Sequence, residues 1–207
     1  MNFLQGHDKT ILHDGRLRFN GSVFNVDVEG LQSTIFDPSI VNLFFSDNAA
    51  NATIRGVEGD FTYYTNIEGL SVAGAFSLLN SNIDDKLVPT NDVVVGSELA
   101  FAPGHQGNIR IRKETGMAGG NVGHIQVQYT FSDKSYSDIM EPNKAKQDSY
   151  SYIDLRAGIS NDELTAELYV DNVTDERAEI SNTFVFDRQR VAYIRPTTIG
   201  IRVKKNF

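Results

Sequence analysis

The side chains best suited to catalysis or metal binding are scattered along this chain. Histidine is a common metal ligand and general acid or base. The four histidines are His7, His13, His105 and His124. Their spacing matches no metal-binding motif, and no nucleophile triad, phosphate-binding loop or dinucleotide fingerprint stands out. The absence of cysteine excludes disulfides and thiolate ligands. The sequence therefore predicts no catalytic, cofactor-binding or metal site, and we expect a protein that is not an enzyme.

Carboxylates in the long polar segments are the remaining candidates for ion binding. Asp47 and the pair Asp84-Asp85 could contact a cation or an iron chelate. Solvated surface charge is the commoner role of such residues, and we interpret them in that way. The net charge of −8, with no basic stripe, disfavours nucleic acid as a partner, and we expect none.

Alternation of apolar and polar residues with period two dominates the sequence, and it is typical of strands with one apolar and one polar face. It is clearest at Val122–Ser132, where Ile125 and Val127 alternate with Gln126 and Gln128. Eight further segments show it: residues 9–12, 16–28, 53–64, 70–78, 108–112, 153–159, 164–170 and 191–207. The sequence therefore predicts an all-β, antiparallel fold of about nine strands without a convincing helix.

One of these segments, residues 16–28, changes phase halfway. Its apolar residues follow one alternation up to Val23 and the other from Phe24 onwards. A β-bulge inserts one residue and shifts the phase of a strand. We therefore expect a bulge near residues 21–24.

The predicted connections alternate in length. Residues 13–15, 65–69, 114–121 and 160–163 are short and rich in Asp, Asn and Gly, as tight turns are. Residues 37–51, 80–107, 137–149 and 176–190 form long polar connections. Transmembrane β-barrels have short periplasmic turns and long extracellular loops. A mean hydropathy of −0.29 is compatible with such a barrel, because only every second residue faces lipid.

Several stretches, in this order, resemble the C-terminal barrel segment of TonB-dependent outer-membrane receptors. They are residues 14–20 leading into 23–27, Arg55-Gly56-Val57-Glu58, Asp171-Asn172-Val173-Thr174-Asp175, and residues 195–203 followed by a terminal Phe207. The resemblance spans nearly the whole chain, although no single motif is decisive.

The resemblance implies a 22-stranded barrel around a plugged lumen, of which residues 1–207 form an incomplete, C-terminal part. The plug domain and the remaining barrel strands are absent from this chain. The family's activity would be import of an iron-siderophore or a similar scarce nutrient, driven by the inner-membrane TonB energy complex through the plug. The location would be the outer membrane of a Gram-negative bacterium, in contact with lipid and lipopolysaccharide. Residues 1–6 are not a signal peptide, so we expect the export signal upstream.

Two groups of residues acquire roles in such a barrel. Gly200, Val203 and Phe207 resemble the C-terminal signal that the barrel-assembly machinery reads in outer-membrane proteins. The polar faces of the strands would line the lumen. The charged residues predicted to face it are Asp154, Arg156, Glu167, Arg202 and Lys204. Glu167 and Arg202 come from consecutive predicted strands, so a cross-strand pair is expected.

Two alternatives stay open. A soluble antiparallel β-barrel that binds a small molecule would show the same alternation with its apolar face turned inward. A non-receptor outer-membrane channel or an esterase barrel is the other alternative. The alternating connection lengths, the terminal aromatic residue and the restriction of charge to the polar faces favour the membrane. Nine strands taken from a larger barrel leave two edge strands without their neighbours. We therefore expect this chain to form a curved, open sheet.

Overall fold

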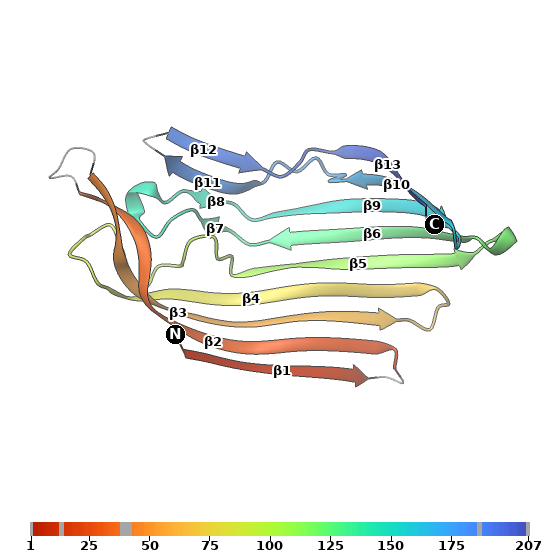
Figure 1. Cartoon of the computed structure of the whole chain (residues 1–207), viewed down its shortest axis with the longest axis horizontal. Coiled ribbons are helices and arrows are strands. Elements are labelled where there is room, and N and C mark those ends of the chain that lie inside the picture. Colours follow the sequence, from red (N-terminus) through yellow and green to blue (C-terminus); the bar gives the residue numbers. More distant parts are fainter. Residues whose placement is uncertain (1, 13–14, 38–42, 186–187, 206–207) are drawn as a thin grey trace.

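The computed structural model describes residues 2–12, 15–37, 43–185 and 188–205. Antiparallel strands make up most of this part of the chain (Figure 1). Two short 3₁₀ helices, η1 (Ala118–Gly120) and η2 (Glu141–Asn143), lie in connections. None of the described helices has the length and apolar character needed to cross a membrane. The all-β prediction is confirmed.

Nine strands form the main sheet, in the order β1-β2-β3-β4-β5-β6-β9-β10-β13. Their bounds are β1 Asn2–Leu12, β2 Leu17–Asp37, β3 Leu43–Tyr64, β4 Leu70–Lys86, β5 His105–Gly116, β6 Val122–Ser132, β9 Tyr150–Ser160, β10 Leu164–Asp171 and β13 Thr198–Lys205. Two small hairpins lie outside this sheet: β7 (Ser135–Tyr136) with β8 (Lys146–Gln147), and β11 (Glu179–Val185) with β12 (Arg188–Tyr193). The predicted number of sheet strands is therefore confirmed.

The predicted alternation of short and long connections is present from β3 onwards. The long connection predicted for residues 37–51 is wrong, because only residues 38–42, which lie outside the described residues, separate β2 from β3. The links β1–β2, β3–β4, β5–β6 and β9–β10 lie at one end of the sheet, which we call the turn end (Figure 1, right). Residues 87–104, 133–149 and 172–197 connect strands at the opposite end, the loop end. Each neighbouring pair in the sheet is antiparallel, because every chain reversal places the next strand beside the last.

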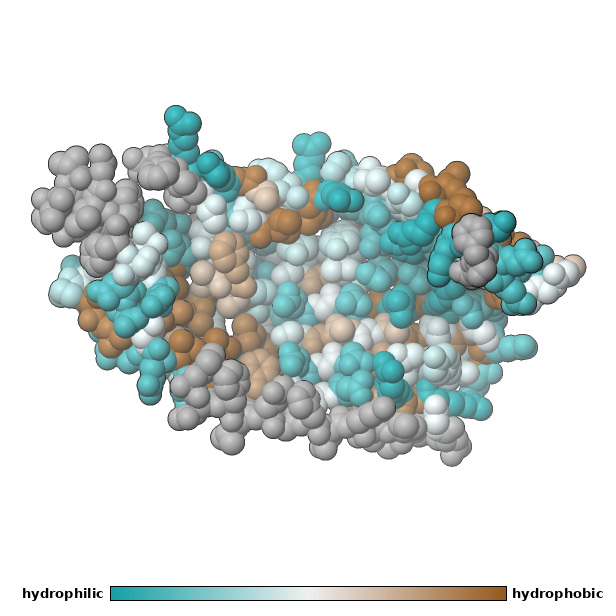
Figure 2. Space-filling model, in the orientation of Figure 1, coloured by the Kyte–Doolittle hydropathy of each residue, from teal (hydrophilic) through white to brown (hydrophobic). Residues whose placement is uncertain are grey.

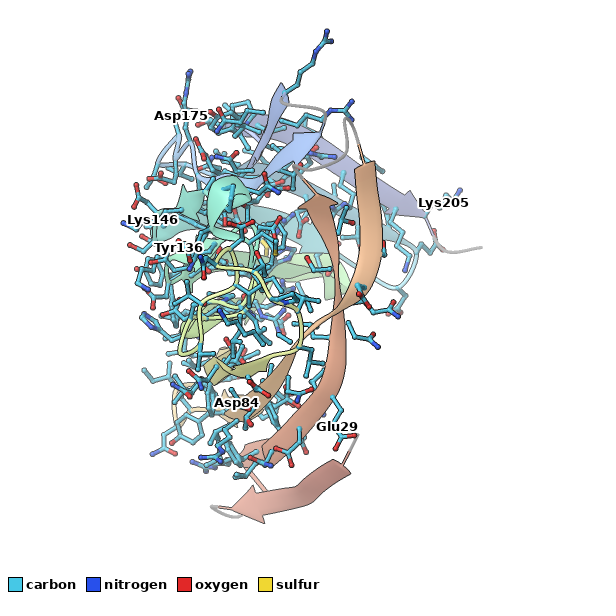
Figure 3. The ribbon with its side chains drawn as sticks, turned by 90° about the vertical axis from the view of Figure 1, so that its left-hand side faces the viewer. Glu29, Asp84, Tyr136, Lys146, Asp175 and Lys205 are labelled. Carbon is cyan, nitrogen blue, oxygen red and sulfur yellow. The ribbon has the colours of Figure 1, made fainter. Side chains whose placement is uncertain are left out.

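The described sheet is open. Strands β1 and β13 stand at its two edges and do not pair with each other. Figure 3 looks along the strands from the loop end and shows that the sheet curves strongly. This is the curved, open sheet that the sequence predicts.

Cross-strand register sorts the side chains onto two faces. In β6, Val127 pairs with Leu155 and Ile111, whereas the adjacent Gln128 pairs with Asp154 and Arg110. The same sorting continues across the sheet, so one face is mainly apolar and the other polar. Figure 2 looks onto the concave polar face, where teal and white side chains predominate over the central strands. The apolar side chains point to the convex side.

Aromatic rings cover glycines of neighbouring strands on the apolar face. Phe61 pairs with Gly74, and a Cβ at Gly74 would lie 2.8 Å from the Phe61 ring. Phe131 covers Gly107 in the same way, at 3.0 Å. A glycine inside a strand offers no side chain to pack, and a cross-strand aromatic ring compensates for this. The glycines in these strands are therefore compatible with continuous pairing.

The predicted bulge near residues 21–24 is wrong. Strand β2 pairs with β3 without a break from Leu17 to Val28, and its register shifts only between Val28 and Gln32. Phe24 instead projects from the polar face and covers Gly56, where a Cβ would lie 2.4 Å from its ring. The apolar run from Phe24 is therefore an apolar patch on the polar face.

The sequence also underestimates strand length at the loop end. Residues 43–51, predicted as part of a connection, belong to β3, and β4 continues to Lys86. The predicted connection of residues 176–190 contains the β11–β12 hairpin, and β12 and β13 replace the single final strand predicted for residues 191–207. In residues 43–51 apolar residues stand side by side, at Leu43-Phe44-Phe45 and Ala49-Ala50, so the alternation that predicts a strand is absent there.

The apolar face carries charge at its margins, which also differs from the prediction. Arg55 stands on the apolar-face register towards the loop end. Lys113 and Lys205 pair with Leu70 and Leu164 towards the turn end. The centre of this face, between those positions, carries the apolar residues.

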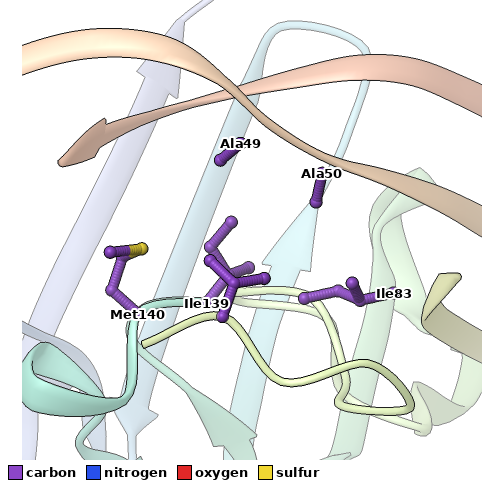
Figure 4. Close-up of a cluster of buried hydrophobic side chains, with 6 residues drawn as sticks. Ala49, Ala50, Ile83, Ile139 and Met140 are labelled. Carbon is purple, nitrogen blue, oxygen red and sulfur yellow. The ribbon is translucent and has the colours of Figure 1, made fainter. Parts of the chain in front are cut away.

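A small hydrophobic core lies at the loop end and fixes the connections there (Figure 4). Ile83 of β4 is fully buried among loop and strand residues. The remaining core residues are Ala49, Ala50, Val93, Ile139 and Met140. Val93 and Met140 form a β-bridge between the loops of residues 87–104 and 133–149. The two loops are therefore packed against each other and against the extended strands.

Candidate functional site

A charged cluster on the polar face centres on Glu167 of β10. Its Oε1 accepts hydrogen bonds from Arg202 at 3.2 Å and from Arg156 at 3.4 Å. Arg156 also donates to Asp171 at 3.0 Å. The side chains of Glu167 and Arg156 are 12% and 22% exposed, so solvent and salt screen their attraction less than that of the 63% exposed Arg202. The expected Glu167–Arg202 pair is present.

His124 of β6 joins this cluster across an intervening strand. Its Nε2 lies 3.1 Å from Oε2 of Glu167, and its side chain is 3% exposed. The Nδ1 atom is buried and has no described hydrogen-bond partner. The sequence analysis did not identify His124 as part of a charged cluster, because the spacing of the histidines was compared only with metal-binding motifs. Its position on the polar face of the most regular predicted strand could have indicated that it lies beside other polar-face residues.

Tyr169 packs between the two arginines of the cluster. The guanidinium carbons of Arg156 and Arg202 each lie 5.7 Å from the centre of its ring. Gly200, opposite Tyr169 in the register, leaves room for the ring, since a Cβ there would lie 2.3 Å from the tyrosine oxygen. Cation–π packing therefore adds to the ion pairs that hold β9, β10 and β13 together.

Asp154 has a structural contact of its own. Its Oδ1 accepts a hydrogen bond from the backbone N–H of Asn172 at 2.8 Å. Asn172 has a positive φ of 52° and donates to the backbone oxygens of Glu176 and Arg195. The segment that resembles the family's motif therefore forms the turn where the chain leaves β10.

The predicted lumen-facing residues Asp154, Arg156, Glu167, Arg202 and Lys204 all occupy positions on the polar face. Of the predicted assembly signal, Gly200 is on the polar face and Val203 on the apolar face. Phe207 lies outside the described residues. The recognition of this signal stays a prediction.

A second zone of the polar face lies nearer the loop end and carries hydroxyl, amide and carboxylate groups. It borders a shallow, open depression of about 530 Å³. The polar-face residues that line it include Asn20, Ser22, Glu58, Asp60, Ser77, Gln106 and Asn108. Asn20 and Ser22 donate to Asp60 and Glu58, each at 3.0 Å. These groups bind one another and water, and they do not form a nucleophile–base arrangement.

The loop end has an ion pair outside the strands of the sheet. Lys134 Nζ donates to Glu98 Oε1 at 3.0 Å and lies 5.0 Å from the centre of the Tyr136 ring. The hydrogen bond with Glu98 raises the pKa of Lys134 above its usual value. This pair links the same two loops that the hydrophobic core connects. Tyr136 and Lys146 are labelled on this connection in Figure 3.

The acidic candidates of the sequence do not form a metal site in the described residues. Asp84 belongs to β4, where it accepts hydrogen bonds from Thr53 at 2.5 Å and from Asn82 at 3.0 Å. Asp47 belongs to β3. Across the described residues, no group of three or more His, Cys, Asp and Glu side chains is placed to hold a metal ion.

Comparison with known proteins agrees with this architecture. Residues 6–173 match a family described as "TonB dependent receptor-like, beta-barrel". Solved structures show the same fold at low sequence identity. The ferric yersiniabactin uptake receptor FyuA from Yersinia pestis is 16% identical with a TM-score of 0.76, over 99% of this chain and 30% of that one.

Two further receptors give similar values. The ferric citrate transporter FecA is 13% identical with a TM-score of 0.73, over 98% of this chain and 31% of the transporter. The siderophore receptor PiuA from Acinetobacter baumannii is 13% identical with a TM-score of 0.71, over 97% of this chain and 27% of that receptor. The chain thus spans less than a third of the length of each of these three proteins.

Proposed function

Because the chain belongs to the family of TonB-dependent receptor-like β-barrels, we propose that it forms the C-terminal part of the wall of an outer-membrane receptor. The receptor would import an iron-siderophore or a similarly scarce nutrient. Receptors with such cargo, for ferric yersiniabactin and ferric citrate, share the fold. Residues 1–207 would act as one barrel segment, with the loop end outside the cell.

The exposure of the apolar face is the observation that carries this proposal. Val23, Ile125 and Ile201 are 65%, 62% and 74% exposed. Contiguous apolar surface on this scale is rare on soluble proteins and is the normal wall of a membrane barrel. The same arrangement opposes the soluble-barrel alternative, since that fold would enclose these side chains.

The two unpaired edges of the described sheet indicate that the receptor has further barrel strands. Exposed strand edges in hydrocarbon leave backbone groups without hydrogen bonds, so further barrel strands must pair with β1 and β13. The charged polar face would then meet a plug domain, through which the inner-membrane TonB complex would act. The barrel-assembly machinery would insert the protein into the outer membrane of a Gram-negative cell, where lipid and lipopolysaccharide surround it.

Two measurements test the proposal. The purified protein should need detergent or lipid to fold, and a monomer that melts cooperatively in plain buffer would contradict the membrane location. Deletion of the gene should abolish growth on one ferric siderophore of a panel under iron limitation. The same growth should require the TonB complex. Growth that persists without TonB would indicate a passive channel instead.

A further inference from the structure

The connection of residues 172–197 carries four exposed arginines at the loop end, and we call it the arginine arm. Arg177 stands two residues before β11 and Arg195 two residues after β12, one on each side of the hairpin base. Arg188 and Arg190 stand two residues apart on β12, a rise of about 7 Å along one face of the strand. The hairpin of this arm lies beside β8 (Figure 1).

These arginines are not neutralised. In the described part of the chain, none of the four forms an ion pair. Two carboxylates of the arm contact neutral groups instead: Asp175 accepts from the N–H of Thr197 at 3.1 Å, and Glu179 accepts from the amide of Asn182 at 3.1 Å. Asp187 lies outside the described residues, and a single carboxylate would neutralise only one of the four arginines.

The neighbouring connection, residues 133–149, shows the opposite arrangement. Its three lysines, Lys134, Lys144 and Lys146, pair with Glu98, Glu141 and Asp148. Their positive charges are therefore balanced within the loops. The unbalanced positive charge of the connections at the loop end is thus concentrated in the arginine arm.

Hydrogen bonds hold the arginine arm in a defined conformation. Asn172 is 3% exposed and donates to the backbone oxygens of Glu176 and Arg195 at 2.9 and 2.8 Å, which ties the start of the arm to its end. Gln189 of β12 donates to Asn182 of β11 at 2.9 Å, which links the two strands of the hairpin. A preorganised arm loses little conformational entropy when it binds a ligand.

We propose that the arginine arm selects a cargo with net negative charge, namely a ferric chelate that presents carboxylate or catecholate oxygens. Guanidinium groups bind such oxygens through paired N–H donors, and a patch of uncompensated positive charge attracts anions from a distance. This inference deepens the proposed function and rests on it, with the loop end outside the cell. A neutral chelate would gain nothing from the charge of this arm.

The first test identifies the charge of the cargo. Iron-limited cells that carry the full-length receptor are offered ferric dicitrate, a ferric tris-catecholate or ferrichrome. The first two chelates are anionic, and ferrichrome, a ferric tris-hydroxamate, is neutral. We expect TonB-dependent growth on an anionic chelate. Growth on ferrichrome alone would overturn this inference and leave the proposed function intact, whereas growth on none of the three would count against the proposed function itself.

The second test measures uptake of that chelate with radioactive iron. The double variant Arg188→Gln, Arg190→Gln should raise KM about tenfold and leave the maximal rate unchanged, because the arm captures the cargo and does not move it through the barrel. Added salt should raise KM of the wild type more than that of the variant, since salt screens exposed charge. Arg188→Lys with Arg190→Lys should restore most of the affinity, because the charge is retained.

The matched control is the double variant Lys134→Gln, Lys146→Gln, which removes two positive charges from the neighbouring connection, where both are already paired. Its KM should stay within about twofold of the wild type. Immunoblots of outer membranes confirm equal amounts of each variant. An unchanged KM in the arginine variant, or an equal rise in the lysine control, would overturn the proposal.

Discussion

Glu167 and His124 meet across β9 because both stand opposite Gly158 in the register. The imidazole Nε2 and the carboxylate Oε2 are 3.1 Å apart, directly over that glycine. A Cβ at Gly158 would lie 2.7 Å from Cε1 of His124 and 2.5 Å from the backbone oxygen of Ala166. Because Gly158 of β9 has no side chain, His124 of β6 and Glu167 of β10 can contact each other across it.

Gly158→Ala should break this contact. The new methyl group must displace the His124 ring and shift backbone, and overpacking of this kind costs about 1–3 kcal/mol. Urea unfolding of the receptor in detergent micelles measures the change. Gly116→Ala is the control, because a Cβ there meets nothing within 4 Å. Equal midpoints for the two variants would contradict the packing role of Gly158.

Glu167→Gln tests the ion-pair cluster itself. The substitution leaves Arg202 without its carboxylate and Arg156 with Asp171 alone, so we expect a loss of about 1–3 kcal/mol in unfolding free energy. Glu114→Gln removes a carboxylate that is 48% exposed and pairs with Arg112, and it should cost less than about 1 kcal/mol. If both variants lose the same unfolding free energy, the cluster around Glu167 stabilises the protein no more than the exposed Arg112–Glu114 pair does.

Neighbouring substitutions in β6 test which face contacts lipid. Val127→Lys places a charge in the middle of the apolar face, where the cost in a membrane barrel is about 2–4 kcal/mol. Gln128→Lys places it on the polar face, beside Asp154 and Arg110 in the register, and should be tolerated. Folding yield into lipid vesicles measures both. A better yield for Val127→Lys than for Gln128→Lys would reverse our assignment of the faces.

Ile83→Ala should release the loops at the loop end. The side chain is fully buried, and a cavity of this size costs about 2–5 kcal/mol locally. Protease cleavage within residues 87–104 and 133–149 should accelerate, while the strands in the membrane stay protected. Val95→Ala removes a side chain that is 51% exposed and should leave cleavage unchanged. Cleavage of the membrane strands in Ile83→Ala would show that the core supports the whole sheet instead.

The Lys134–Glu98 pair gives the loops a dependence on alkaline pH. Folding raises the pKa of Lys134, so the pair stabilises the loops fully below the ordinary lysine pKa of 10.5 and is lost as pH rises through the folded value. Protection of the loops from cleavage should therefore fall above about pH 10.5. Both groups are more than a third exposed, so salt should weaken the effect. In Lys134→Met this pH dependence should disappear. A wild-type protein with no fall in protection would contradict a role for the pair.

The sequence predicts the central sheet well, because each of its strands has one face in an apolar environment and the other in a polar one. This requirement determines the alternation of residue types from Leu70 to Leu78 and from Val122 to Ser132. Prediction from the sequence fails where the two faces of a strand no longer differ in this way. Residues 43–51 extend β3 past the apolar border, and their apolar residues stand in adjacent positions and do not alternate with polar ones. Phe24 lies on the polar face and covers Gly56. An apolar residue on that face looks in the sequence like a change in the phase of the alternation, and the predicted bulge resulted from it.

The site was predictable only in part, for a related reason. The residue types of the polar face are visible in the sequence, so Glu167 and Arg202 could be paired in advance. The link from His124 depends on the register across three strands and on the missing side chain of Gly158. Neither is apparent before the strands are aligned.

Strands β1 and β13 both run from the loop end to the turn end, since nine alternating strands begin and finish with the same polarity. Two strands of equal polarity cannot become antiparallel neighbours. Closure into an all-antiparallel cylinder therefore demands an odd number of additional strands, and an even total. For a cylinder of 22 strands the complement is 13, which meets the requirement. A partner segment contributing an even number would leave one parallel seam.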